Sequence, residues 1–94
     1  MYPRSVAALL LALIASQADG REFGGYFCGD CSGHKAGYEW AETREVKSTR
    51  QCEEILRRWP NRQSFYEGCL VYVKDPTRGP EHDDSGEEID YHPR

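Results

Sequence analysis

Four cysteines and one histidine are the candidate reactive or metal-binding side chains of this sequence. Cys28 and Cys31 form a CxxC motif, His34 follows three residues later, and Cys52 and Cys69 lie further along the chain. A CxxC pair beside a helix N-terminus can exchange disulfides, because that setting lowers the pKa of a thiol. The same two sulfurs with a histidine have the ligand spacing of a zinc site. In an oxidising compartment, four cysteines instead form two structural disulfides.

The pattern of the N-terminal residues predicts export, which helps to choose between redox exchange, zinc binding and structural disulfides. Arg4 precedes an apolar run at residues 5–16, and residues 16–18 (SQA) fit the small-x-small pattern of a signal-peptide cleavage site. The run is too short to cross a membrane, which takes about 20 apolar residues. We therefore predict that residues 1–18 are a signal peptide, that the mature protein has no membrane span, and that it is periplasmic or secreted.

Export favours disulfides over metal binding and redox catalysis. Exported thiols pair before they meet scarce metal, so we expect no cofactor, and no zinc ion held by Cys28, Cys31 and His34. A redox role for the CxxC motif needs a surrounding βαβ pattern, which this sequence lacks. Four cysteines allow three pairings, and the sequence does not choose among them. Bridges from Cys28 and Cys31 to the two later cysteines would tie the N-terminal arm to the helices, whereas the alternative joins Cys28 to Cys31 and Cys52 to Cys69.

The sequence predicts no catalytic residue. His34 could act as a base oriented by Asp30 or Glu67, but no serine or free cysteine in a motif context stands beside it as a nucleophile. Hydroxyls that could serve as nucleophiles fit helix N-caps instead, at Ser32, Ser48 and Ser64.

Helical patterns supply the elements that position these side chains. Residues 33–43 predict a first helix, in which Gly33 and Gly37 would allow another backbone to approach closely. Residues 48–59 and 64–74 predict two more helices, each with a capping box at its start, an apolar stripe, and a proline after its end. The short connection between these two predicts that they are antiparallel neighbours.

These elements predict a small all-α fold, a three-helix cluster stapled by disulfides from Cys28, Cys31, Cys52 and Cys69, over residues 19–75. A domain this small needs cross-links because it buries little apolar surface. We expect both tryptophans in its core: Trp40 and Trp59.

The last residues of the chain are expected to form a disordered acidic tail. Residues 76–94 hold six acidic residues against two arginines, and Ile89 is their only aliphatic side chain. The tail accounts for the net charge of −4, so the rest of the chain is balanced and shows no basic footprint for nucleic acid.

Two stretches of the chain resemble a known group of proteins. Residues 30–41 read D-C-S-G-H-x-A-G-Y-x-W-A, Cys52 follows, and residues 64–69 read S-F-x-E-G-C. This pattern is similar to that of uncharacterised small exported bacterial proteins. The resemblance implies a bacterial source and a place in the envelope or outside the cell, and it implies no reaction and no catalytic residue.

We therefore expect a non-enzymatic exported miniprotein that acts as an interaction or binding module. Its contact surface would be the basic outer face of the helix over residues 48–59, or the acidic tail, and its partner another envelope or extracellular protein. The alternatives are a thiol redox protein that uses Cys28 and Cys31, and a small zinc-binding module.

Overall fold

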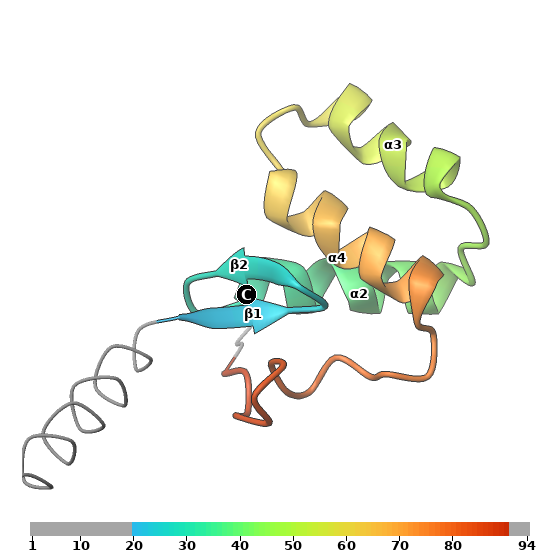
Figure 1. The fold of residues 1–94 in the computed structure, drawn as a ribbon. Helices are drawn as coiled ribbons and strands as arrows, with labels where there is room; N and C mark the ends of the chain where they lie inside the picture. The colour runs from blue at the N-terminus through green and yellow to red at the C-terminus, as the bar shows by residue number, and fades with distance from the viewer. Residues whose placement is uncertain (1–19, 91–94) are drawn as a thin grey trace, which may run out of the picture.

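A computed structural model describes residues 20–90, which form a β-hairpin, three helices and a C-terminal segment (Figure 1). The elements in chain order are β1 (Arg21–Phe23), β2 (Tyr26–Cys28), α2 (Ser32–Arg44), α3 (Thr49–Arg58) and α4 (Gln63–Lys74). The three helices confirm the helical part of the predicted fold. The two-stranded sheet corrects the all-α prediction, and the predicted signal peptide lies outside the described residues.

The hairpin forms because two glycines make its turn. Gly24 and Gly25 both have positive φ, at 60° and 89°, the conformation that a two-residue hairpin turn matched to the twist of its strands requires. The strands pair antiparallel, with Phe23 opposite Tyr26 and Arg21 opposite Cys28. The N-terminal arm is therefore a defined hairpin that ends at the first cysteine of the CxxC motif.

Helix α4 lies between α2 and α3 in Figure 1 and packs against both. Where α4 meets α2, the backbones of the two helices are in direct contact. A Cβ atom added at Gly37 would lie 2.0 Å from the carbonyl oxygen of Phe65, and one added at Gly68 would lie 2.1 Å from the carbonyl oxygen of His34. The close approach predicted at Gly37 is confirmed, and Gly68 supplies the matching position on α4.

The helix starts only partly follow the predicted caps. The capping box at Ser48 and Gln51 is present, and Gln51 Oε1 accepts a hydrogen bond of 3.1 Å from the backbone of Ser48. The capping box predicted at Ser64 is wrong. Arg62 occupies the N-cap position of α4, so Ser64 lies inside the first turn, where it faces Gly33 of α2.

The buried side chains form two clusters that meet along α4. One joins the hairpin, α2, α4 and the C-terminal segment, and contains Phe23, Cys28, Cys31, Tyr38, Val71 and Ile89. The other joins the three helices, and contains Ala41, Val46, Cys52, Ile55 and Cys69. Each cluster holds one pair of cysteines.

The C-terminal segment corrects the prediction of a disordered tail over residues 76–94. Ile89 is 2% exposed in the first cluster. The phenol of Tyr38 donates a hydrogen bond to the carbonyl of Asp75 (3.0 Å) and accepts one from the amide of Gly79 (2.8 Å). Residues 76–90 are thus packed onto the domain, whereas residues 91–94 lie outside the described part of the chain. Disorder was the wrong expectation because the charges of this segment have partners within the fold.

Asp83 is the most deeply held of these charges. It is 4% exposed, and its carboxylate accepts hydrogen bonds from the hydroxyl of Ser85 (2.7 Å), the amide of Glu87 (3.0 Å) and Nε of Arg21 (2.7 Å). The hydrogen bond from Ser85 and the ion pair with Arg21 lower the pKa of Asp83 far below its usual range, against the effect of burial.

Asp84 fastens the same segment to the hairpin turn. Its carboxylate accepts hydrogen bonds from the amides of Gly24 (2.7 Å) and Gly25 (2.8 Å) and from Arg78 (2.8 Å). Burial would raise the pKa of Asp84, but these donors lower it. The guanidinium of Arg78 also lies 3.9 Å from the ring centroid of Phe23. The acidic segment therefore stabilises the hairpin.

The first prediction concerns the backbone contact of α2 and α4. Gly37→Ala should lower the free energy of unfolding by about 2–3 kcal/mol, because a methyl group cannot enter without moving the backbone of α4. Urea unfolding followed by circular dichroism measures this. Gly29→Ala is the control, since a Cβ there has open space within 4 Å. Equal stability of the two variants would contradict the contact.

The second prediction concerns pH. Because the folded pKa of Asp83 is depressed, its stabilisation is complete above the ordinary carboxyl pKa of about 4 and is lost as pH falls below it. Asp83→Asn should cost about 2 kcal/mol at pH 7 and should flatten the loss of stability between about pH 5 and 3. Urea midpoints across this range measure both effects. Glu53→Gln, at an exposed position, should keep the wild-type pH profile.

Candidate functional site

The cysteines form two separate bridges. Cys28, the last residue of β2, is joined to Cys31, and Cys52 of α3 is joined to Cys69 of α4. This is one of the pairings that the sequence left open, and the bridges from the arm to the helices are not formed. The Cys52–Cys69 bridge forms because α3 and α4 run antiparallel across a short connection, which brings these two inward positions to a Cα separation of 5.7 Å.

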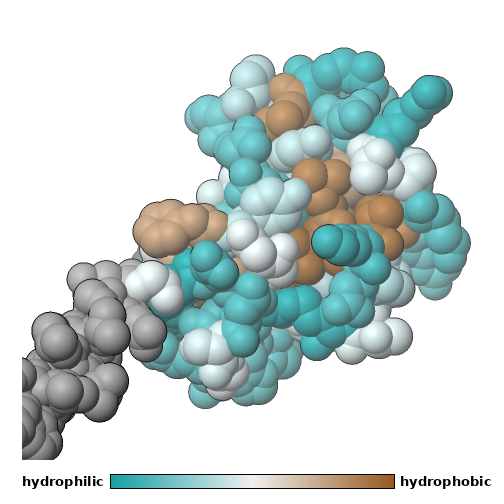
Figure 2. Space-filling model, viewed as in Figure 1, coloured by the Kyte–Doolittle hydropathy of each residue, from teal (hydrophilic) through white to brown (hydrophobic). Residues whose placement is uncertain are grey.

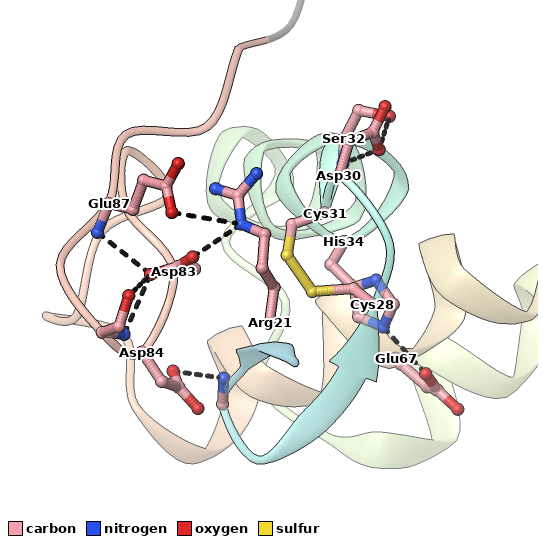
Figure 3. Close-up of a disulfide and its surroundings, with 12 residues drawn as sticks. Arg21, Cys28, Asp30, Cys31, Ser32, His34, Glu67, Asp83, Asp84 and Glu87 are labelled. Carbon is pink, nitrogen blue, oxygen red and sulfur yellow. Dashed lines mark hydrogen bonds and ion pairs between the residues drawn. A yellow bond between two sulfur atoms is a disulfide. The ribbon is translucent and has the colours of Figure 1, made fainter. Parts of the chain in front are cut away.

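The Cys28–Cys31 bridge sits between the hairpin and the start of α2 (Figure 3). Its two residues are 6% and 2% exposed. Cys31 is the N-cap residue of α2, with φ of +66°, so the cap predicted at Ser32 is displaced by one residue. The backbone amide of Ser32 donates to the carboxylate of Asp30 (3.0 Å), and that hydrogen bond lowers the pKa of Asp30. A carboxylate thus occupies the helix N-terminus that would otherwise stabilise a thiolate.

His34 and Glu67 form a buried contact between α2 and α4, and Figure 3 shows the imidazole pointing toward the carboxylate. The distance from Nε2 to Oε1 is 2.8 Å, and His34 is 2% exposed, with the rings of Phe23 and Tyr26 about 6 Å away. Of the two carboxylates that could orient His34, Glu67 contacts its imidazole, whereas Asp30 is bonded to Ser32 instead. The enclosed imidazole is part of the packing between α2, α4 and the hairpin.

The two sulfurs of the zinc alternative are joined to each other in this structure. Cys28 and Cys31 share one disulfide, so neither is a thiolate that could join His34 around a metal ion. Within residues 20–90, no group of three or more histidine, cysteine, aspartate or glutamate side chains is placed to hold a metal ion.

A groove of about 400 Å³ between α2 and α3 combines aromatic rings with arginines. Its lining consists of Trp40, Arg44, Glu54, Ile55, Arg58 and Trp59. Trp40 is half-buried against Phe65 in an edge-to-face contact, with ring centroids 5.9 Å apart. Ile55 is buried beneath them and gives the groove an apolar floor.

Trp59 corrects the prediction that both tryptophans lie in the core, because it is 46% exposed. The helical pattern placed it on the inward stripe of α3, but α3 ends at Arg58 and Trp59 is the C-cap, with φ of −134°. The restriction that Pro60 imposes on the preceding residue takes Trp59 out of helical geometry and off the stripe. Its ring instead stands at the edge of the groove.

The charges of the groove are predominantly positive. The guanidinium of Arg44 lies 4.5 Å from the centroid of Trp40, and that of Arg58 lies 6.0 Å from the centroid of Trp59. Glu54 is hydrogen-bonded to Arg57. Among the described residues, neither Arg44 nor Arg58 has a carboxylate partner. Sequence reasoning missed Arg44, although its position four residues after Trp40 places the two on one face of a helix.

A larger hollow of about 480 Å³ lies between the hairpin and the C-terminal half of α4. Figure 2 shows apolar surface gathered over α4 on this face and bordered by hydrophilic residues. The charged residues that line the hollow are Lys74, Asp75, Arg78 and Asp84, two of each sign. This balance gives the hollow no preference for a charged ligand, so the groove between α2 and α3 is the stronger candidate.

Comparisons of the chain with protein-family models, curated proteins and solved structures found no match. Across residues 20–90, no helix has the length and apolar character needed to cross a membrane.

The third prediction concerns the Cys28–Cys31 bridge. Its burial and the neighbouring Asp30 disfavour a thiolate, so its reduction potential should lie below about −300 mV, as for structural disulfides. Alkylation and mass spectrometry across dithiothreitol redox buffers measure the potential. The Cys52→Ala/Cys69→Ala variant confirms the assignment, because only this bridge remains in it. A potential between about −270 and −120 mV, the range of disulfide oxidoreductases, would contradict the prediction.

Proposed function

We propose that this chain is an exported, non-enzymatic, disulfide-stabilised module that binds another protein of the envelope or the extracellular space. The observation that carries the proposal is the groove between α2 and α3, with its exposed Trp59 and its two arginines, which have no carboxylate partner within residues 20–90. Tryptophan and arginine are the residues most enriched at the energetic centres of protein interfaces.

Different observations support the exported location and the non-enzymatic role in this proposal. Two disulfides within the described residues suit an oxidising compartment, and the sequence of residues 1–18 has the pattern of a signal peptide. His34, the buried histidine of residues 20–90, is hydrogen-bonded to Glu67 and enclosed by aromatic rings, which supports a binding role over a catalytic one.

The contact surface proposed is the C-terminal end of the basic face of α3, extended onto α2, and it leaves out the first turn of α3. Arg57 and Arg58 both lie on the outer face of α3, but Arg57 is paired with Glu54, whereas Arg58 lines the groove. Arg44 contributes the second groove charge from α2. The acidic segment is the weaker alternative surface, because Asp83 and Asp84 are already used within the fold.

A thiol redox protein is the second candidate, favoured by one specific observation. The two cysteines of the CxxC motif are bridged to each other at the N-terminus of α2, the arrangement that lowers thiol pKa in disulfide oxidoreductases. Burial of both residues and the carboxylate of Asp30 count against it. A potential in the oxidoreductase range would reverse the ranking of the two candidates.

The fourth prediction tests the binding module. The oxidised chain, immobilised and exposed to the exported proteins of its source cell, should retain a partner. The Arg44→Ala/Arg58→Ala variant should lose at least about tenfold in affinity, because hot-spot arginines each contribute more than about 1 kcal/mol. Surface plasmon resonance with the recovered partner measures the loss.

The matched control is Lys47→Ala/Arg50→Ala, which removes the same charge from exposed positions outside the groove. It should keep wild-type affinity. Equal losses in both variants would mean that net charge, rather than the groove, determines binding. Failure of the wild-type chain to retain any partner would overturn the proposal.

A further inference from the structure

We infer that the groove between α2 and α3 takes an acidic peptide segment that carries one large apolar side chain beside its carboxylates. The inference deepens the proposed function and rests on it, because it names the chemical class of the partner at the same surface. The apolar floor, the positive charge and the concave shape of the groove support it, as does the fact that Asp83 and Asp84 of this chain are already bonded within the fold.

The floor of the groove selects an apolar side chain. Ile55 is 1% exposed and lies under the half-buried ring of Trp40, while the ring of Trp59 stands at the rim with nearly half of its surface in water. A volume of about 400 Å³ lies within the range of sites that enclose a ligand group, about 300–1,000 Å³. An aromatic or large aliphatic side chain placed there would remove Trp59 and the upper face of Trp40 from water.

The charges beside this floor select carboxylates. Arg44 and Arg58 come from different helices, and each guanidinium lies over a tryptophan ring of the groove. The contact with Trp40 orients Arg44, whereas Arg58 lies at the outer limit of a cation–π contact with Trp59. Both guanidinium groups keep N–H donors for a carboxylate, which a guanidinium can bind through two hydrogen bonds. Glu54, the acid that lines the groove, is paired with Arg57, so the charges of these two cancel and Arg44 and Arg58 leave the groove positive.

A peptide fits these observations better than a second copy or a lipid surface. In a second copy, the acidic segment is committed: Ile89 is buried, and Asp83 and Asp84 are bonded to the hairpin. A flat anionic membrane would meet the arginines but could not fill a concave site. The groove therefore calls for a chain that presents a protruding apolar side chain between carboxylates.

The fifth prediction tests this with defined probes. Three heptapeptides, with a central Phe, Trp or Leu flanked by two glutamates on each side and a glycine at each end, are titrated into the oxidised full chain. The indole N–H signals of Trp40 and Trp59 in ¹H–¹⁵N spectra report binding. At least one peptide should shift both signals in a saturable way.

Each half of the inference has its own control peptide. Replacing the glutamates by glutamines, or the central residue by alanine, should weaken binding at least about tenfold, a difference of about 1.4 kcal/mol. The Arg44→Ala/Arg58→Ala chain should bind at least about tenfold more weakly, and Lys47→Ala/Arg50→Ala should match the wild type at 0.15 M salt, where distant charges are screened within about 8 Å. Circular dichroism checks that both variants are folded.

The outcomes separate this inference from the proposed function. If glutamine peptides bind the groove as well as glutamate peptides, the ligand class is wrong while the groove remains a binding surface. If phosphatidylglycerol vesicles shift the indole signals and no peptide does, the groove faces a lipid surface and the inference falls. If no probe moves either signal, the inference falls, and the capture experiment with the exported proteins decides the proposed function independently.

Discussion

The backbones of α2 and α4 touch, and this close contact sets the positions of the other elements. Gly37 and Gly68 let the two helices touch where any side chain would hold them apart. At that separation His34 reaches Glu67 across the interface, and Tyr38 is fully buried beside α4. A wider spacing would open the small core and leave a buried histidine without its partner, a cost that a domain of this size could not offset.

A disulfide and a set of carboxylate contacts hold the remaining elements to the α2–α4 pair. The Cys52–Cys69 bridge fixes α3 to α4, and so determines how α3 stands relative to α2. Carboxylates hold the C-terminal segment to the hairpin without covalent bonds. Asp83 binds Arg21, and Asp84 binds the glycine turn of the hairpin. The acidic C-terminal segment is thus a structural element, which narrows the search for a binding surface to the basic side of the molecule.

The candidate site is a product of this arrangement. Its residues come from the C-terminal halves of α2 and α3 and from the C-cap of α3, which are brought together because both helices pack on α4. Trp40 and Ile55 serve the core and the groove floor at once, whereas Arg44, Arg58 and Trp59 face water. The site therefore combines a rigid apolar base with charged groups that are free to meet a partner.

Local periodicity, capping chemistry and cysteine content were enough to predict the three helices, the capping box at Ser48, the close approach at Gly37 and the presence of cross-links. They could not predict which cysteines pair, where Trp59 lies or whether the acidic segment is ordered. The reason is that each depends on groups distant in sequence: Cys52 meets Cys69 only after α3 and α4 dock, and Asp83 is an isolated charge until the hairpin presents Arg21. The composition of that segment shows its acidic residues but not their partners, so it predicted disorder. In the fold, Arg21 and the glycine turn of the hairpin bind these carboxylates.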